Sequence, residues 1–165
     1  MKYSLASSTW DENELKAIQS IIDKDIYTMG NSVKQFEENF SKYLDSKYCV
    51  MTSSGSTANL LATAALFYTK NPKLKRGDEV IVPAVSWSTT YFPLQQYGLK
   101  LKFVDIDLKT LNYDLKALEE AISFSTKMVM VVNLLGNQNN FDKINNIIKD
   151  KDIFILEDNC ESMGA

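Results

Sequence analysis

The chain has 165 residues, 45% of them hydrophobic, which is enough for one ordinary hydrophobic core. Its 18 basic and 21 acidic residues are spread along the chain and give a net charge of −3, so no basic stripe is available for a nucleic acid. No apolar run approaches the roughly 18 residues of a membrane span, and we expect a soluble cytoplasmic protein. Histidine is absent, which excludes a Ser-His-Asp triad, a Cys-His pair and an imidazole-bound metal within these residues.

The two cysteines, Cys49 and Cys160, stand in unrelated contexts, one within an apolar run and one after an acidic residue. This spacing suggests neither a disulfide framework nor a thiolate metal site. We therefore expect two reduced thiols and no metal.

The first part of the chain is predicted to form two amphipathic helices. Thr9 to Glu12 has the spacing of a capping box, which would start the first helix. Apolar residues at intervals of three and four then mark one face of each helix. These residues are Leu15, Ile18, Ile21 and Ile22 in the first helix, and Val33, Phe36, Phe40, Tyr43 and Leu44 in the second.

After these helices the pattern alternates between strand and helix. Five short apolar runs are predicted to be strands: Tyr48 to Met51, Val80 to Val82, Leu101 to Val104, Met128 to Val132 and Ile153 to Leu156. The helical segments between them are Thr57 to Tyr68, Trp87 to Tyr97, Asp114 to Ile122 and Phe141 to Lys149. Apolar strands joined by helices predict an α/β fold with a mostly parallel sheet that is covered by helices on both faces.

In an open α/β sheet, ligands bind at the carboxyl ends of the strands. The first predicted strand is followed by small hydroxyl residues around Gly55 at the start of a helix. Free backbone amides, hydroxyl groups and the helix dipole there would suit a phosphate. The pattern matches neither a P-loop nor a dinucleotide fingerprint. The residues alone leave open that Ser54 or Ser56 only caps the helix.

Two further candidates follow other strands. Trp87 comes after the second predicted strand, where its ring could stack on an aromatic ligand or simply pack in the core. Asp158 follows the last strand, and a buried carboxylate needs a positive or hydrogen-bonding partner. A protonated ring nitrogen or an arginine would serve. Asp105 and Asp107 could imitate an acid pair, but their spacing favours turn and capping roles.

A phosphate loop, an aromatic ring and a strand-end aspartate are together what a pyridoxal phosphate site requires. In this order they resemble the DegT/DnrJ/EryC1/StrS sugar aminotransferase family, and the resemblance extends over essentially the whole chain. It implies the large domain of a fold type I PLP-dependent transferase. Residues 1–165 would be the N-terminal part of that domain, with its remainder and a small C-terminal domain absent. The supporting segments are Met29 to Glu37, Gly77 to Pro83 and Phe103 to Asp107.

The resemblance assigns a role to each candidate. Gly55, Ser56 and Thr57 would bind the cofactor phosphate, Trp87 would stack on the pyridine ring, and Asp158 would pair with the protonated ring nitrogen. Three residues further on, Glu161 stands where the aminotransferases usually carry Gln or His near the cofactor's phenolic oxygen. An acid at this position resembles the dehydratase branch of the family. Asp158 and Glu161 are thus the implied catalytic residues.

The dehydratase branch implies loss of the C3 hydroxyl from a nucleotide-linked 4-keto-6-deoxyhexose, GDP-4-keto-6-deoxy-D-mannose, during synthesis of deoxysugars for the lipopolysaccharide O-antigen. L-glutamate would supply the amino group that converts pyridoxal 5'-phosphate to pyridoxamine 5'-phosphate, and a homodimer would form the complete site. A histidine base is expected beyond Ala165. A lysine there would favour the alternative, a nucleotide-sugar aminotransferase.

An alternative of another class is a truncated, non-catalytic α/β module, which predicts neither cofactor absorbance nor a stable dimer.

We expect isolated residues 1–165 to be inactive and poorly soluble, because fold type I sites are shared between two subunits and need the rest of the sheet. The measurement is an assay of the purified 165-residue chain with pyridoxal phosphate, glutamate and the nucleotide sugar. Measurable deamination or dehydration would contradict the expectation.

Overall fold

The computed structural model describes residues 7–164. The chain forms two compact units, of which the first ends at Met51 and the second begins at Thr52. Within the described part of the chain, no helix is both long enough and apolar enough to span a bilayer.

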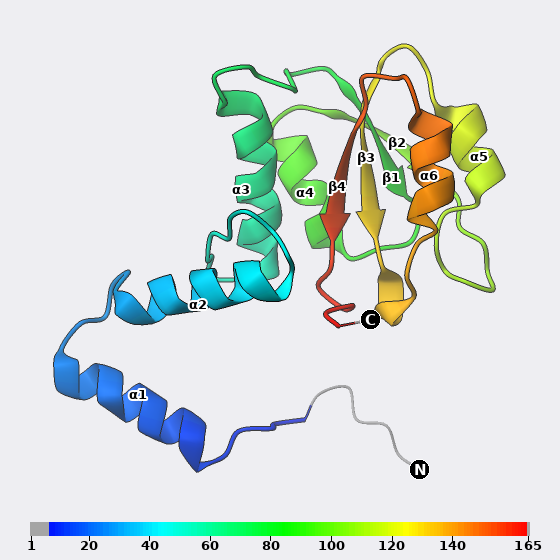
Figure 1. The fold of residues 1–165 in the computed structure, drawn as a ribbon. Coiled ribbons are helices and arrows are strands. Elements are labelled where there is room, and N and C mark those ends of the chain that lie inside the picture. The colour runs from blue at the N-terminus through cyan, green and yellow to red at the C-terminus, as the bar shows by residue number, and fades with distance from the viewer. Residues whose placement is uncertain (1–6, 165) are drawn as a thin grey trace. The chain divides into compact units, whose positions relative to one another are not determined.

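The first unit consists of two helices, α1 (Glu12–Lys24) and α2 (Asn31–Tyr43) (Figure 1). Both helices were predicted from their apolar faces. The capping box of α1 differs from the prediction, because Asp11 is the N-cap and Glu14 completes the box, with its Oε2 2.7 Å from the Asp11 amide. The Thr9 to Glu12 box was therefore wrong by two residues: both pairs have the same spacing, and the carboxylate of Asp11 caps the helix instead of the threonine hydroxyl.

The segment from Tyr48 to Met51, predicted to be a strand, forms no strand. A strand needs a hydrogen-bonding neighbour, and none of the residues described by the structure pairs with this segment. Instead, the Met51 amide donates to Oε1 of Glu37, and 76% of Tyr48 is exposed. The apolar pattern of this segment is typical of a strand, but it carries no information about whether a neighbouring strand is present to pair with it.

The second unit is built on a four-stranded parallel sheet with the order β2-β1-β3-β4. Its strands are β1 (Glu79–Pro83), β2 (Lys100–Val104), β3 (Thr126–Val132) and β4 (Phe154–Asp158). Its helices are α3 (Gly55–Tyr68), α4 (Ser88–Gln96), α5 (Leu115–Ala121) and α6 (Phe141–Ile148). Four of the five predicted strands and all the predicted helices are therefore confirmed.

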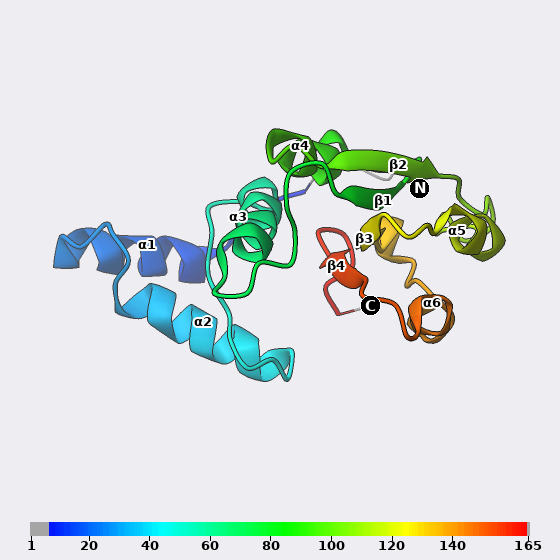
Figure 2. The ribbon, with the colours of Figure 1, turned by 90° about the horizontal axis from the view of Figure 1, so that it is seen from above.

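Helices cover both faces of this sheet, as the near-continuous apolar strands predicted (Figure 2). Alternate residues of each central strand point to opposite faces. Val80, Val82, Met128 and Met130 join one core cluster, which includes side chains from α3 and α4. Ile81, Val129 and Val131 join the other, with side chains from α5 and α6. The α/β fold class is thus confirmed.

The direction of the strand order reverses next to β1. The chain runs from β1 through α4 to the edge strand β2, then returns through α5 to β3 on the other side of β1. Right-handed crossovers in opposite directions place α4 and α5 on opposite faces. Loops diverge at the carboxyl ends of strands where such a reversal occurs, which is where ligands bind in this architecture.

Replacing the fully buried Leu118 by Ala should lower the free energy of unfolding by about 2 to 5 kcal/mol, because it leaves a cavity between α5 and the sheet. Leu108 is the matched control, since 86% of it is exposed and its replacement by Ala should change stability by less than about 0.5 kcal/mol. Urea unfolding of both variants tests this. Equal losses would contradict the assigned core.

Candidate cofactor site

Asp158 is the last residue of β4, and only 7% of it is exposed. Its Oδ2 accepts hydrogen bonds from Nδ2 of Asn59 at 2.9 Å and from Oγ1 of Thr90 at 3.4 Å. Its Oδ1 accepts one from the amide of Cys160 at 3.2 Å. None of the ion pairs formed by residues 7–164 involves Asp158, so hydrogen bonds take the place of the arginine that the sequence had left open.

These bonds bring three distant segments of the second unit together. Asn59 lies in α3, four residues after Gly55, or roughly 6 Å along the helix axis. Thr90 lies in the first turn of α4, three residues after Trp87. The starts of α3 and α4 therefore meet the end of β4 at the Asp158 carboxylate. The helix starts that carry the predicted phosphate loop and aromatic ring thus lie beside the predicted aspartate.

Ser54 caps α3 in a reciprocal pair with Thr57. The Thr57 amide lies 3.2 Å from Ser54 Oγ, and the Ser54 amide lies 3.0 Å from Thr57 Oγ1. The capping interpretation is thus correct for Ser54, but the cap leaves other backbone amides of the loop without a partner. The amides of Gly55 and Ser56 have no acceptor in the described part of the chain. A Cβ at Gly55 would meet no atom within 4 Å, so no other side chain covers this residue. Amides without an acceptor at a helix start suit an anion.

Trp87 is the N-cap residue of α4, and 74% of it is exposed. Its ring is therefore not packed in the hydrophobic core. Core packing was one of the two possibilities that the sequence left open. An exposed indole at the carboxyl end of β1 offers a flat surface to an aromatic ligand. In contrast, Thr90 one turn later is buried.

Glu161 lies in the turn after β4, where it is exposed. Its Oε2 accepts a hydrogen bond of 2.6 Å from the Leu135 amide in the loop after β3. Leu135 has a φ of 53°, which turns this loop sharply. Asn133 adds to this connection, because its Nδ2 donates to Oε1 of Glu157 in β4 and to Oδ1 of Asn159 in the turn after it. The turn that carries Glu161 is thereby fixed to the neighbouring strand end.

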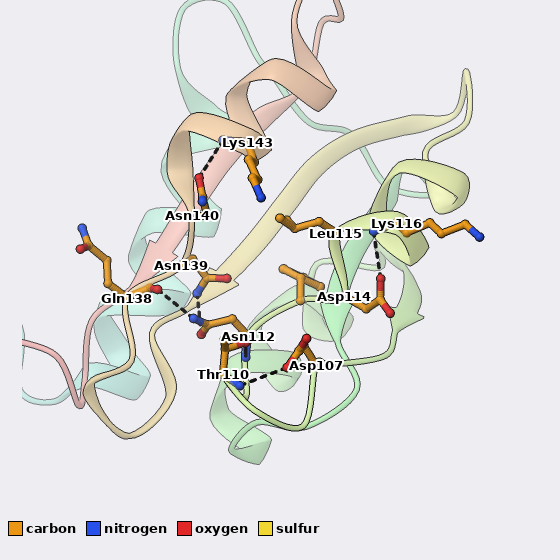
Figure 3. Close-up of a pocket in the computed structure, with 11 residues that line it drawn as sticks. Asp107, Thr110, Asn112, Asp114, Leu115, Lys116, Gln138, Asn139, Asn140 and Lys143 are labelled. Atoms are coloured by element: carbon orange, nitrogen blue, oxygen red, sulfur yellow. Dashed lines mark hydrogen bonds between the residues drawn. The ribbon is translucent and has the colours of Figure 1, made fainter.

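A separate hollow of about 520 Å³ lies where α5 and α6 begin (Figure 3). Its polar side chains bond to one another and to nearby backbone, as Asn139 does to Asn112 at 3.1 Å. Asp107 accepts from the Lys109 amide, and Asp105 accepts from the Ile106 amide, so the turn interpretation of these aspartates is confirmed. Residues 7–164 contain no cluster of His, Cys, Asp and Glu suited to a metal ion.

Two residues of the site had no role in the sequence prediction, Asn59 and Thr90. Asn59 could have been noticed from the sequence, since it places a polar amide in a mostly apolar helix, where it is buried. A buried polar side chain requires a partner, but its position in the sequence does not name that partner. Thr90 left no comparable signal.

The family model described as the DegT/DnrJ/EryC1/StrS aminotransferase family matches residues 8–165, so the chain belongs to this family. GDP-4-keto-6-deoxy-D-mannose 3-dehydratase of Yersinia pseudotuberculosis is 70% identical over all of the chain and 42% of the relative. The enzyme of the same name from Escherichia coli O55:H7 is 67% identical over the same shares.

Solved structures agree with these relatives. The E. coli GDP-4-keto-6-deoxy-D-mannose 3-dehydratase with bound hydrated PLP has a TM-score of 0.96 and 67% identity, over 99% of this chain and 42% of that one. An aminotransferase from Psychrobacter cryohalolentis has a TM-score of 0.86 at 25% identity, over 95% and 39% of the two chains. The predicted family and its aminotransferase fold are confirmed. The chain spans less than half the length of these relatives.

The Cys160 thiol should react slowly at pH 8. Partial burial and the nearby negative charges of Asp158 and Glu161 raise the pKa of this thiol to about 11. All of these causes disfavour the thiolate, so its fraction at pH 8 should be roughly a hundredfold below that of an ordinary thiol. Iodoacetamide alkylation of a Cys49→Ser variant, compared with free cysteine from pH 7 to 11, measures this. Equal rates at pH 8 would contradict it.

Proposed function

We propose that residues 1–165 are the N-terminal part of the PLP-binding large domain of a nucleotide-sugar 3-dehydratase, acting on GDP-4-keto-6-deoxy-D-mannose. The relatives of 67 and 70% identity carry this activity in their names. The observation that carries the proposal is the buried Asp158 carboxylate, held where the starts of α3 and α4 meet the end of β4.

The residues of the site suit the cofactor at each of its chemical groups. Gly55 and Ser56 present free amides to the phosphate, and the dipole of α3 favours its negative charge. Thr57 lies at the same helix start, although its hydroxyl is engaged with Ser54. Trp87 presents an exposed ring for stacking on the pyridine. The set matches an aromatic phosphate ester with a basic ring nitrogen.

When bound, pyridoxal 5'-phosphate or its pyridoxamine form supplies an electron sink for the pair released as a substrate proton leaves. Asp158 holds a proton at the ring nitrogen, because a carboxylate favours the protonated form of a base beside it. Glu161, whose carboxylate accepts from the Leu135 amide, would face the cofactor's phenolic oxygen, and an acid there would mark the dehydratase rather than the aminotransferase branch. Trp87 would cover one face of the ring and keep water from it.

The remaining parts of the proposal concern the complete protein. L-glutamate is the amino donor, and the site is completed in a homodimer. The proton-transferring base is a histidine outside residues 1–165, in keeping with the 42% share of the relatives that the chain covers. The substrate loses its C3 hydroxyl, and ammonia is released.

Replacing Asp158 by Asn in the full-length protein, as its gene encodes it, should lower kcat to below about a hundredth while some cofactor stays bound. A neutral amide cannot hold the proton on the ring nitrogen, whereas the phosphate contacts are unchanged. Asp152→Asn is the control, since its carboxylate is exposed and, among residues 7–164, pairs only with Lys127. Turnover of the nucleotide sugar and cofactor absorbance are the measurements. Unchanged activity of Asp158→Asn would remove Asp158 from its proposed role.

A further inference from the structure

We propose that Asn59 is a positioning residue that fixes the orientation of the Asp158 carboxylate toward the cofactor ring; this inference rests on the function proposed above. The two residues are 99 positions apart in the sequence, and both are buried. Their contact, at 2.9 Å between Nδ2 and Oδ2, is the shorter of the two side-chain hydrogen bonds to this carboxylate.

The orientation of the Asn59 amide follows from its partners. Its Nδ2 donates to Oδ2 of Asp158 and lies 3.4 Å from the carbonyl oxygen of Thr89. Both partners can only accept, so the amide oxygen of Asn59 cannot occupy this side. Asn59 therefore presents both of its N–H donors to the start of α4 and the end of β4.

The hydrogen bonds of the carboxylate leave one position for a ligand. A carboxylate has about four acceptor sites, two on each oxygen. Asn59 and Thr90 occupy those of Oδ2, and the Cys160 amide occupies one on Oδ1. One acceptor site on Oδ1 remains for a protonated ring nitrogen.

Thr90 supports the same arrangement from α4. Its hydroxyl donates to Oδ2, so the bond of 2.8 Å between Thr90 Oγ1 and Ser86 Oγ has Ser86 as its donor. The Thr90 contact of 3.4 Å is long for a hydroxyl donor, which makes Asn59 the principal constraint. Without Asn59, the carboxylate can turn about its terminal torsion, which is intrinsically broad.

The decisive variant is Asn59→Leu in the full-length holoenzyme, since leucine has nearly the same shape but no donor. We expect kcat to fall roughly 10- to 100-fold, the range for a lost hydrogen bond to a charged group. KM for the nucleotide sugar should stay within about threefold, because the loss falls on the chemical step. Affinity for pyridoxal phosphate, from absorbance titration, should fall about tenfold or more.

Thr63→Val is the matched control. Thr63 is buried one turn further along α3, and its hydroxyl donates to the backbone oxygen of Asn59 rather than to Asp158. This variant removes a buried hydroxyl from the same helix face, so it reports general disturbance of α3. We expect its kcat and cofactor affinity to match those of the wild type.

A double-mutant cycle separates positioning from packing. If Asn59 acts through Asp158, then Asn59→Leu should lower cofactor affinity in the wild type but not further in Asp158→Asn. Additive losses, a wild-type kcat in Asn59→Leu, or an equal loss in Thr63→Val would each overturn the inference. If Asn59→Leu does not fold, Asn59→Ser, which cannot reach Asp158, replaces it in the same cycle with the same expected result.

The same experiment distinguishes this inference from the proposed function. A wild-type protein that neither binds pyridoxal phosphate nor converts the nucleotide sugar overturns both. A wild type that does both, and loses activity in Asp158→Asn but not in Asn59→Leu, overturns only the role of Asn59.

Discussion

Burial of the Asp158 carboxylate is the constraint on which the site depends. A carboxylate removed from water costs several kcal/mol unless donors replace its hydration. Here the donors are Asn59 from α3, Thr90 from α4 and the Cys160 amide. Satisfying one buried charge therefore fixes the starts of two helices against the end of β4. The same contacts that make the charge tolerable assemble the proposed cofactor site.

The topology of the sheet makes this arrangement possible. All four strands are parallel, so β1 and β4 end at the same edge, and the order reverses beside β1. Trp87 follows β1, and Glu161 follows β4, although 74 residues of sequence separate them. The loop after β3 then restrains the turn after β4 through the Leu135 amide. Geometry at this edge is thus set by backbone connections, whereas the chemistry is set by a few side chains.

The sequence predicted the parts of the molecule that local pattern controls. The apolar run from Val80 to Val82 predicted a buried strand, because a strand that is covered on both faces does not alternate between apolar and polar residues. The prediction failed where strand formation depends on pairing with another strand. Tyr48 to Met51 has the composition of a strand, but no described residue pairs with it in a sheet. The capping box of α1 was misplaced because two pairs with equal spacing compete.

Some residues of the candidate site could likewise be predicted from local pattern, and others could not. Trp87 and Asp158 were found because one follows a strand and the other ends one, a position that topology links to ligand binding. Gly55 was found after a predicted strand that does not form, because small hydroxyl residues surround it at the start of a helix. Asn59 was not, because its role depends on a hydrogen bond to a residue 99 positions away. Contacts of that separation arise only when the sheet is assembled, and no local pattern encodes them.

The central claim is that Asp158 holds a proton on the ring nitrogen of a bound pyridoxal phosphate. Nitrogen-15 NMR of the full-length protein, loaded with cofactor that is labelled at the ring nitrogen, tests this most directly. The account predicts the chemical shift of a protonated pyridinium throughout neutral pH, and its loss in Asp158→Asn. A signal of unprotonated pyridine nitrogen in the wild-type protein would contradict it.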